Sequence, residues 1–437
     1  MQSSNNNQSY IAPNGVPRGE VCTKAIDSNH PLILSDTFPT GPFSFLDPKF
    51  QKEKPRLPPP VYLSLPMLSK EKPVTKEQVF TASGCEITPD GELKLVDENM
   101  IKQQRGVVME VAKQLAKSVM EGRGVVGLSL PVRIFEPRST LERIVDWWSF
   151  APTYLTTAAR TEDPVERMKN VIAFCISGLY VSASQAKPFN PYLGETYQGV
   201  MDDGTEIYCE HTSHHPPIAN FYLVNPEYKF YGRYLFDGRL SKNTLYVRQE
   251  GPNYIEFKDK TRIVFSLPGL KVKGMLLGDR LVHYHGVAKF IDPLNGIKAV
   301  IKMSSAEKKG FFGKRKHDTF DGKLYFCKTA VEQKKFKSKD EEDEDDLKFA
   351  DIAKEISLIS GSYLENLLFD GKEYWNINQQ KPSGYKPVND PLPSDVRFRE
   401  DMIWLKYGNL TNAGDWKVRL EEQQRWDRKM RGIDKKS

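Results

Sequence analysis

The sequence predicts a mainly β fold, a large antiparallel sheet closed into a barrel or a sandwich, with helices before and after it. Beyond Glu195 the chain becomes at least eleven short, alternating segments such as ETYQGVM, TEIYCEHT and IANFYLV, separated by turns such as DDGT and FDGR. So many strands in one open sheet would be unusual, so we expect closure into a barrel or a sandwich. A barrel of this size has room for a ligand.

Composition places the chain among globular proteins of mild positive charge. Its 437 residues are 39% hydrophobic and 27% charged, with a formal net charge of +6. That charge is too small for a nucleic-acid-binding stripe but is compatible with an anionic membrane. The longest apolar stretch, 171–181, is about half of what spanning a bilayer needs, and no signal peptide is visible. We expect a cytoplasmic monomer that contacts membranes only peripherally and binds no nucleic acid.

The common motifs of enzymes and metal sites are missing from the sequence. It contains no Walker loop, dinucleotide fingerprint, HExxH or GxSxG motif. The cysteines stand singly, which argues against a disulfide framework and against a thiolate zinc site. They are Cys22, Cys85, Cys175, Cys209 and Cys327. We therefore expect no catalytic residues, no metal and no cofactor.

The chain before the strands begins with a polar extension. Residues 1–20 are rich in Asn and Ser, and prolines recur from 36 to about 75. From Met100 to Met120 the pattern is helical, and EGRG at 121–124 ends the helix. Apolar residues at steps of three or four mark one face of this helix, namely Val108, Val111, Leu115 and Val119.

Two further helical regions frame the strands. PRSTLERIVDWW begins with a Ser139 cap and has Glu142 three residues on, as in a capping box. DPVERMKNVIAFCISGLYV follows, with Pro164 near a helix start. After Pro393 the chain is helical again. The acidic run KDEEDEDD at 339–346 is either a solvated loop between strands or a docking tract for another protein.

The run CEHTSHHPPIAN at 209–220 holds three of the seven histidines. Because the flanking residues read as strands, alternation places His211 and His215 on one face and His214 on the other. Three zinc ligands would then converge poorly. General-base catalysis lacks a nucleophile and an orienting partner nearby. Hydrogen bonding at a strand end and anion recognition by imidazoles held by the Pro-Pro pair remain open.

Two other groups of polar residues are suited to an anion. In AKPFNPYLGE (186–195) the prolines fix an extended loop that can present Lys187 and Asn190. In the last helix Lys417, Glu421 and Arg425 follow at steps of four and share one face. An ordinary helix-to-strand connection and a solvated helix with ion pairs are the alternative interpretations.

These motifs, in this order, resemble the oxysterol-binding protein-related lipid-transfer family. EHTSHHPP is similar to its signature, usually Glu-Gln followed by Val or Thr and then SHHPP. KPFNPYLGE is similar to its Lys-Pro-(aromatic or Leu)-Asn-Pro-x-Leu-Gly-Glu segment. LSLPVRIFEPRSTLERI (128–144) resembles the start of its domain, and RFREDMIWLKYGNL with KVRLEEQQRWDRK resembles its end. The resemblance covers roughly residues 105–432 and is that of a short form without a pleckstrin-homology domain.

The resemblance implies a large, nearly closed antiparallel β-barrel that encloses one lipid in an apolar tunnel under an N-terminal lid. Family members carry a sterol or a phospholipid and exchange it for phosphatidylinositol 4-phosphate between membranes. The family's headgroup-binding positions fall on Lys187, Asn190, His214, His215, Lys417, Glu421 and Arg425.

On this basis we divide the chain into three parts. Residues 1–99 are the extension, 100–127 the lid helix with its hinge, and 128–437 the lipid-binding domain. For the helix, a plain packing role is the alternative to a lid. The resemblance also predicts peripheral association with organelle membranes or contact sites.

Two departures from the family pattern bear on the ligand. Position 211 is His where the family more often has Gln, which predicts a change in headgroup contacts or in pH response. SVMEGRGVVG lacks the Leu-Arg-Pro-Gly-like sequence of phosphatidylserine carriers, which favours sterol as the cargo. A phosphatidylserine exchanger is the alternative, and a metal-dependent enzyme that uses His211, His214 and His215 is a remote one.

Overall fold

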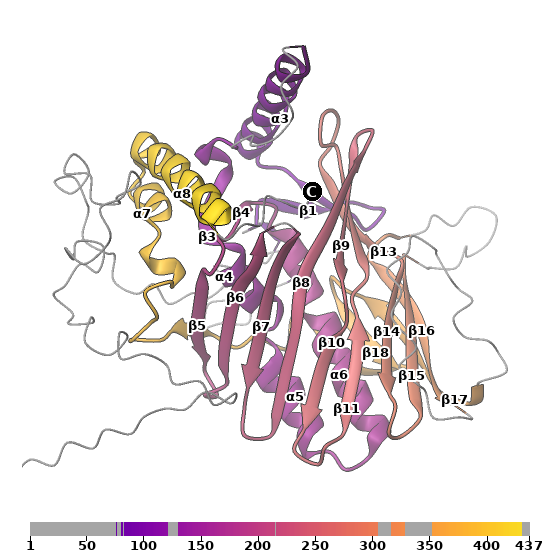
Figure 1. Ribbon diagram of the computed structural model, residues 1–437. Helices are drawn as coiled ribbons and strands as arrows, with labels where there is room; N and C mark the ends of the chain where they lie inside the picture. The colour runs from indigo at the N-terminus through magenta and orange to yellow at the C-terminus, as the bar shows by residue number, and fades with distance from the viewer. Residues whose placement is uncertain are drawn as a thin grey trace, which may run out of the picture.

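One curved antiparallel sheet makes up most of the structure (Figure 1). The computed structural model describes residues 76, 80–81, 83–120, 130–214, 216–304, 316–327 and 352–430. Predictions that lie outside these residues are those for most of the extension at 1–99, the hinge at 121–127 and the acidic run at 339–346.

The sheet contains eighteen strands within the described residues. Its main ladder runs from β20 through β5, β6, β7 and β8 to β10, β11 and β14, and then in chain order to β19. The strands of this ladder are β5 (Thr196–Met201), β6 (Glu206–His214), β7 (Pro217–Val224), β8 (Tyr228–Ser241), β10 (Asn253–Phe257), β11 (Arg262–Ser266), β14 (Val287–Asp292), β15 (Ile297–Met303), β16 (Thr319–Cys327), β17 (Ile352–Ser362), β18 (Asn366–Phe369), β19 (Lys372–Asn376) and β20 (Tyr385–Pro387).

A branch leaves the ladder at β8, because the first half of this long strand pairs with β10 and the second half with β9. The branch continues through β12 and β13 to a hairpin. Its strands are β9 (Thr244–Glu250), β12 (Gly269–Lys273), β13 (Leu281–His285), β1 (Cys85–Ile87) and β2 (Leu93–Leu95). No ladder joins β19 to β20 within the described residues. The predicted antiparallel, barrel-like fold is therefore confirmed, as a sheet that curves without closing.

Alternation along the strands explains why the sheet has one apolar face. In β15, Ile297, Ala299, Ile301 and Met303 are buried, whereas Lys302 on the other face is exposed. A strand turns successive side chains to opposite faces, so this pattern directs the apolar set to the interior.

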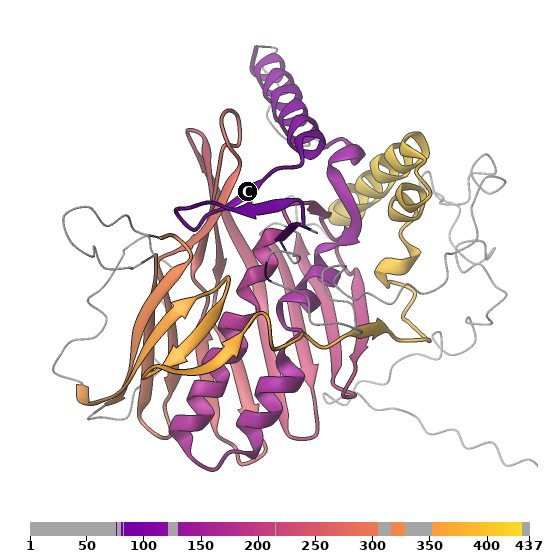
Figure 2. The same ribbon diagram turned by 180° about the vertical axis from the view of Figure 1, so that it is seen from behind.

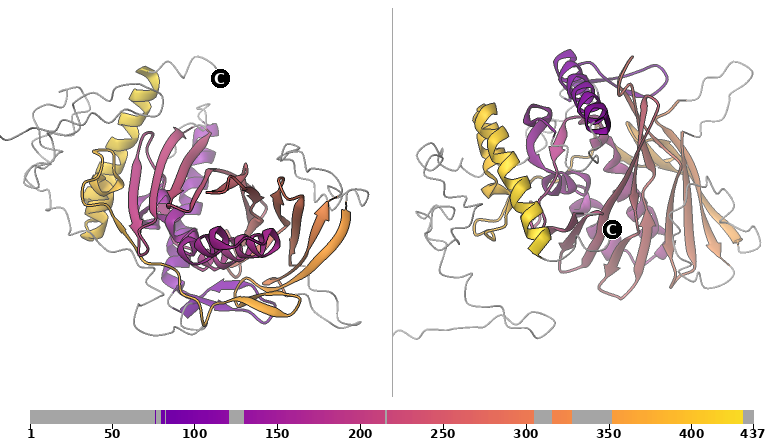
Figure 3. Two further views of the ribbon diagram at one scale, coloured as in Figure 1. Left: turned by 90° about the horizontal axis from the view of Figure 1, so that it is seen from below. Right: turned by 45° about the horizontal axis from the view of Figure 1, so that its top comes forward.

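Three helices lie within the curve of the sheet, as the views from behind and from below show (Figures 2 and 3). They are α4 (Thr140–Trp147), α5 (Ala151–Arg160) and α6 (Pro164–Ser177), followed by the 3-10 turn η4 (Leu179–Ala183). The predicted capping box is confirmed, since Ser139 and Glu142 exchange side-chain-to-backbone bonds. Asp163 caps α6, and Pro164 opens that helix, as predicted.

Trp148 joins these helices to the sheet. Its ring lies 5.3 Å from that of Phe174 in α6, 4.8 Å from that of Phe230 in β8 and 6.2 Å from that of Phe265 in β11. Buried aromatic side chains contribute large apolar areas, so this cluster fixes the helices inside the curve.

The remaining helices lie outside the sheet (Figure 1). α3 (Glu98–Met120) projects above it, and η3 (Val132–Ile134) lies between α3 and the C-terminal α8 (Leu410–Met430), contacting both. α7 (Glu400–Lys406), preceded by η7 (Val396–Phe398), packs on α8. None of the helices within the described residues is long and apolar enough to cross a membrane.

Candidate functional site

Two cations lie against one aromatic ring beside the C-terminal helix. β3 (Phe135–Ser139) and β4 (Lys187–Phe189) form a short parallel pair, and the rings of Phe135 and Phe189 stack at 4.5 Å. Lys187 Nζ lies 5.1 Å and Lys417 Nζ 5.5 Å from the centroid of the Phe135 ring. Such contacts attract a cation to the ring face, so Phe135 holds two ammonium groups in one place.

The loop that carries Lys187 is extended, as its prolines predict. Lys187 begins β4 and donates a hydrogen bond from Nζ to Asn190 Oδ1 at 3.1 Å. Burial, together with the nearby Lys417 charge, lowers the pKa of Lys187 to about 8. The surroundings of this ammonium therefore disfavour its charged form. A bound anion would favour the charged form and raise the pKa again.

The face predicted for the last helix is formed. Lys417 and Arg425 both pair with Glu421, the second at 3.6 Å between Arg425 Nη2 and Glu421 Oε2. Lys417 is only 5% exposed, which does not fit a merely solvated helix. Lys187, Lys417, Arg425 and Glu421 together carry three positive charges and one negative charge.

The histidines are arranged differently from the alternation predicted for a regular strand. A bulge between His211 and Ser213 shifts the register of β6 against β7, and a bulge adds a residue that turns the following side chains. His211 Nε2 and His214 Nδ1 therefore lie 3.1 Å apart. The prediction that His214 faces away from His211 is wrong, and His215 lies outside the described residues.

His211 is a buried, neutral member of this pair. It is 2% exposed, and burial together with His214 lowers its pKa to about 4. The backbone of His211 bonds to the end of the proline-rich loop, through Gly194 N to His211 O at 2.8 Å and His211 N to Glu195 O at 2.9 Å. The histidine strand and the Lys187 loop are thus joined by main-chain hydrogen bonds.

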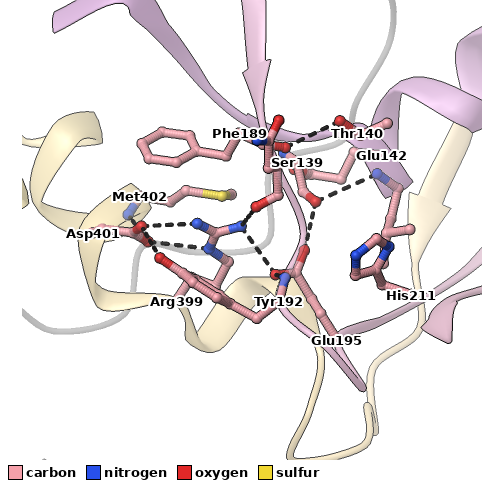
Figure 4. Close-up of polar contacts among 12 residues, drawn as sticks. Ser139, Thr140, Glu142, Phe189, Tyr192, Glu195, His211, Arg399, Asp401 and Met402 are labelled. Carbon is pink, nitrogen blue, oxygen red and sulfur yellow. Dashed lines mark hydrogen bonds and ion pairs between the residues drawn. The ribbon is translucent and has the colours of Figure 1, made fainter. Parts of the chain in front are cut away.

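A buried ionic network supports both groups, and the sequence analysis assigned it no role (Figure 4). Arg399 contacts Glu195 Oε2 at 2.9 Å and Asp401 Oδ2 at 2.8 Å. It also donates to Asn190 O at 2.9 Å. Burial would lower the pKa of Arg399, but Asp401 and Glu195 outweigh it and raise that pKa. Arg399 therefore holds Asn190 and Glu195 in place from the C-terminal side.

The network extends to two further elements. Ser139, the cap of α4, donates from Oγ to Glu195 Oε1. Tyr192 donates from its hydroxyl to Asp401 Oδ2 at 3.3 Å and to Lys417 O at 3.5 Å. The only sequence signal for this network is the charge-dense segment RFRED between apolar residues, and its partners are about 200 positions away.

The predicted lid stripe lies on a helix, as expected. α3 spans Glu98–Met120, so its backbone carries all four predicted positions. The side chains of Val108, Val111, Leu115 and Val119 lie outside the described residues. The first half of α3 is fixed to the sheet, since Arg280 donates to Gln104 Oε1 at 2.7 Å.

The fold and the site together indicate a class of protein that binds an anionic ligand. A curved antiparallel sheet surrounds helices, and Lys187 and Lys417 form a cationic site beside it. The sequence matches the family described as oxysterol-binding protein over residues 112–437. Oxysterol-binding protein 9 of Dictyostelium discoideum is 36% identical over 351 residues, covering 78% of this chain and 79% of that protein.

Solved structures agree in fold. The Osh3 ORD of Saccharomyces cerevisiae in complex with PI(4)P has a TM-score of 0.55 at 22% identity, covering 74% of this chain and 84% of that one. The Osh1 ORD domain in complex with ergosterol has a TM-score of 0.55 at 23% identity, covering 70% and 76%. The chain belongs to the oxysterol-binding protein family.

Proposed function

We propose that this protein carries one lipid within its curved sheet and exchanges it for phosphatidylinositol 4-phosphate between membranes. The observation that carries the proposal is the convergence of Lys187 and Lys417 on the Phe135 ring. Two ammonium groups held together repel each other, and a phosphate dianion between them removes that penalty.

The neighbouring groups supply the rest of a phosphate site. Arg425 adds a third cation, and Glu421 orients both cations of α8. His214, positioned by His211, and the Asn190 amide add hydrogen-bond donors. In this proposal His215 joins His214, and the remaining charge is positive, as an anionic headgroup requires.

A sterol is the favoured second lipid. The solved relatives hold PI(4)P in one case and ergosterol in another, which supports two ligands of this kind. We further propose that residues 128–437 form the lipid-binding domain and that the segment 100–127, which contains most of α3, acts as its lid. No lipid bond is broken in the exchange, so the protein is not an enzyme.

The proposal is tested by lipid extraction from liposomes that contain phosphatidylinositol 4-phosphate and a fluorescent sterol. The double variant Lys187→Met and Lys417→Met should lose phosphoinositide extraction while keeping sterol extraction. Lys354→Met, the same change at an exposed position of β17, is the matched control. Equal loss of both lipids would contradict a headgroup site.

The identity of the second lipid needs a separate measurement. Mass spectrometry of lipid that co-purifies with the full chain should detect a sterol. Phosphatidylserine in its place would favour the phospholipid exchanger and would leave the headgroup site unaffected.

A further inference from the structure

Two histidines and a glutamate from three segments of the chain meet in a cluster that contains none of the headgroup residues. Glu92 precedes β2, His283 lies in β13, and His317 precedes β16. One ligand atom of each lies within 4.8 Å of those of the other two. The rings of His283 and His317 stack with centroids 4.3 Å apart, and Glu92 and His283 are buried.

The backbone brings these three side chains together before any ligand is present. Leu93 pairs with Val282, so Glu92 and His283 are neighbours across the β2–β13 ladder. His317 N donates to Asp90 O at 2.7 Å. Gly91 has a φ of +78°, and a Cβ there would lie 1.9 Å from Asp318 Oδ1. Only glycine allows the hairpin to approach the His317 segment this closely.

The polar atoms of this cluster are incompletely satisfied. Glu92 Oε1 accepts from His283 Nδ1 at 2.8 Å and from Lys273 Nζ at 2.7 Å. His317 Nδ1 is buried and has no hydrogen-bond partner among the described residues. A buried polar atom without a partner has lost its hydrogen bonds to water and gained none in return. The unpaired nitrogen beside a carboxylate and a second imidazole indicates a missing partner.

We propose that Glu92, His283 and His317 bind a divalent zinc-class cation. Two imidazoles and one carboxylate are a ligand set that zinc accepts, with water in the fourth position. Imidazole nitrogens and carboxylate oxygens both carry the lone pairs that a zinc-class cation accepts. Calcium and magnesium prefer oxygen ligands only, and they do not suit this set.

Lys273 competes with the cation for Glu92. Its ammonium occupies Glu92 Oε1, but its side chain is 37% exposed and can turn into solvent. Zinc ligands at about 2.0–2.1 Å in a tetrahedron lie about 3.3 Å apart, so Glu92 and His283 need to separate only slightly. Binding then replaces the single positive charge of the ammonium at the carboxylate by the two positive charges of the cation.

A bound ion would fix the base of helix α3. β2 ends at Leu95 and α3 begins at Glu98, and Figure 2 shows the hairpin beside the foot of this helix. The ion would join the hairpin to β13 and to the segment before β16. The site thus belongs to the structure that carries α3, and it is independent of the lipid proposed above.

Zinc titration of the full chain, freed of metal with a chelator, tests this proposal. We expect one zinc ion per chain in a competition assay with a chromophoric chelator. Cobalt should give the intense visible absorption of a tetrahedral site. His317→Ala and His283→Ala should each weaken binding about 100-fold, because each removes one of three ligands. His285→Ala, two positions along the same strand, is the matched control and should bind normally.

Lys273→Met separates a metal site from a simple ionic contact. Removing the competing ammonium should tighten zinc binding several-fold and leave the fold intact, as circular dichroism would show. Zinc affinity that is unchanged by His317→Ala, or that falls in Lys273→Met, would overturn the proposal, since the cluster would then only tie the hairpin to the sheet.

Discussion

The Arg399 network and the Lys187–Lys417 pair are neighbouring groups that differ in how their positive charges are balanced. In the network one guanidinium contacts two carboxylates, those of Glu195 and Asp401, and all three are buried. Around Phe135, Lys417 pairs with Glu421, which also pairs with Arg425, whereas Lys187 donates to the neutral amide of Asn190. The guanidinium of the first group is matched by carboxylates, whereas the four charged residues of the second group (Lys187, Lys417, Arg425 and Glu421) sum to a net charge of +2.

This difference distinguishes residues that hold other residues in place from residues that can bind a ligand. A buried cation with two carboxylates has no capacity left for a ligand, and removing it leaves buried anions unpaired. Cations that repel each other are relieved by an external anion. Substitutions in the two groups should therefore change stability in opposite directions, and that contrast makes the comparison testable.

The largest effect is expected at Arg399. Arg399→Met leaves the Glu195 and Asp401 carboxylates buried without their cation, so the free energy of unfolding should fall by about 3–5 kcal/mol. Urea unfolding followed by tryptophan fluorescence measures this change. Phosphoinositide binding should fall with it, because Arg399 also holds the carbonyl of Asn190.

A neutral version of the network is the control. Combining Arg399→Met with Glu195→Gln and Asp401→Asn removes all three charges and should recover more than half of the lost stability. A single Arg399→Met variant within about 1 kcal/mol of the native protein would show that the network does not support the site.

Lys187→Met should act in the opposite direction on stability. It removes an ammonium that is disfavoured by burial and by Lys417, so the unfolding midpoint should stay or rise. Affinity for a soluble phosphoinositide should fall about 10- to 100-fold, since one charged hydrogen bond contributes about 1.5–3 kcal/mol. Isothermal titration calorimetry measures this loss, and a fall in both quantities would make Lys187 another structural residue.

The sequence predicted the residues of the second group but not those of the first. Lys417, Glu421 and Arg425 follow a helical period, so their common face could be read from spacing alone. Arg399 and Glu195 are 204 positions apart, and nothing local in the sequence indicates that they meet. The same is true of His283 and His317, which come from different segments, whereas the sequence draws attention to metal binding only at 211–215, where three histidines lie close together.

The bulge in β6 shows a second limit of sequence patterns. In a regular strand His211 and His214 would lie on opposite faces, but the register shift after His211 moves His214 onto the same side. A bulge depends on how two strands pair, and the sequence of one strand does not reveal it. The antiparallel sheet and the capping box at Ser139, which depend on local pattern, were predicted correctly.

The pH dependence of binding should reflect Lys187. Its pKa in the ligand-free protein is lowered to about 8, and a bound phosphate favours the charged form, so the bound pKa is higher. The affinity for the phosphoinositide is therefore highest below pH 8, where Lys187 is charged. It decreases above pH 8, by up to about tenfold per pH unit. Lys187→Arg, which stays protonated, should flatten the profile between pH 8 and 10. An unchanged profile would show that another group titrates.

The smallest effect is expected at His211, and we propose that this residue fixes the proton of His214. His211 Nδ1 is buried without a hydrogen-bond partner among the described residues, so its proton belongs on Nε2, which donates to His214 Nδ1. His214 then carries its own proton on Nε2, where it can donate to a phosphate oxygen.

Because a glutamine amide can donate the same bond, His211→Gln should change phosphoinositide affinity less than about threefold. His211→Leu removes the bond and should weaken affinity about tenfold, with the change in His214 tautomer visible in nitrogen-15 NMR spectra. Equal affinities of the Gln and Leu variants would mean that His211 only fills space beneath His214.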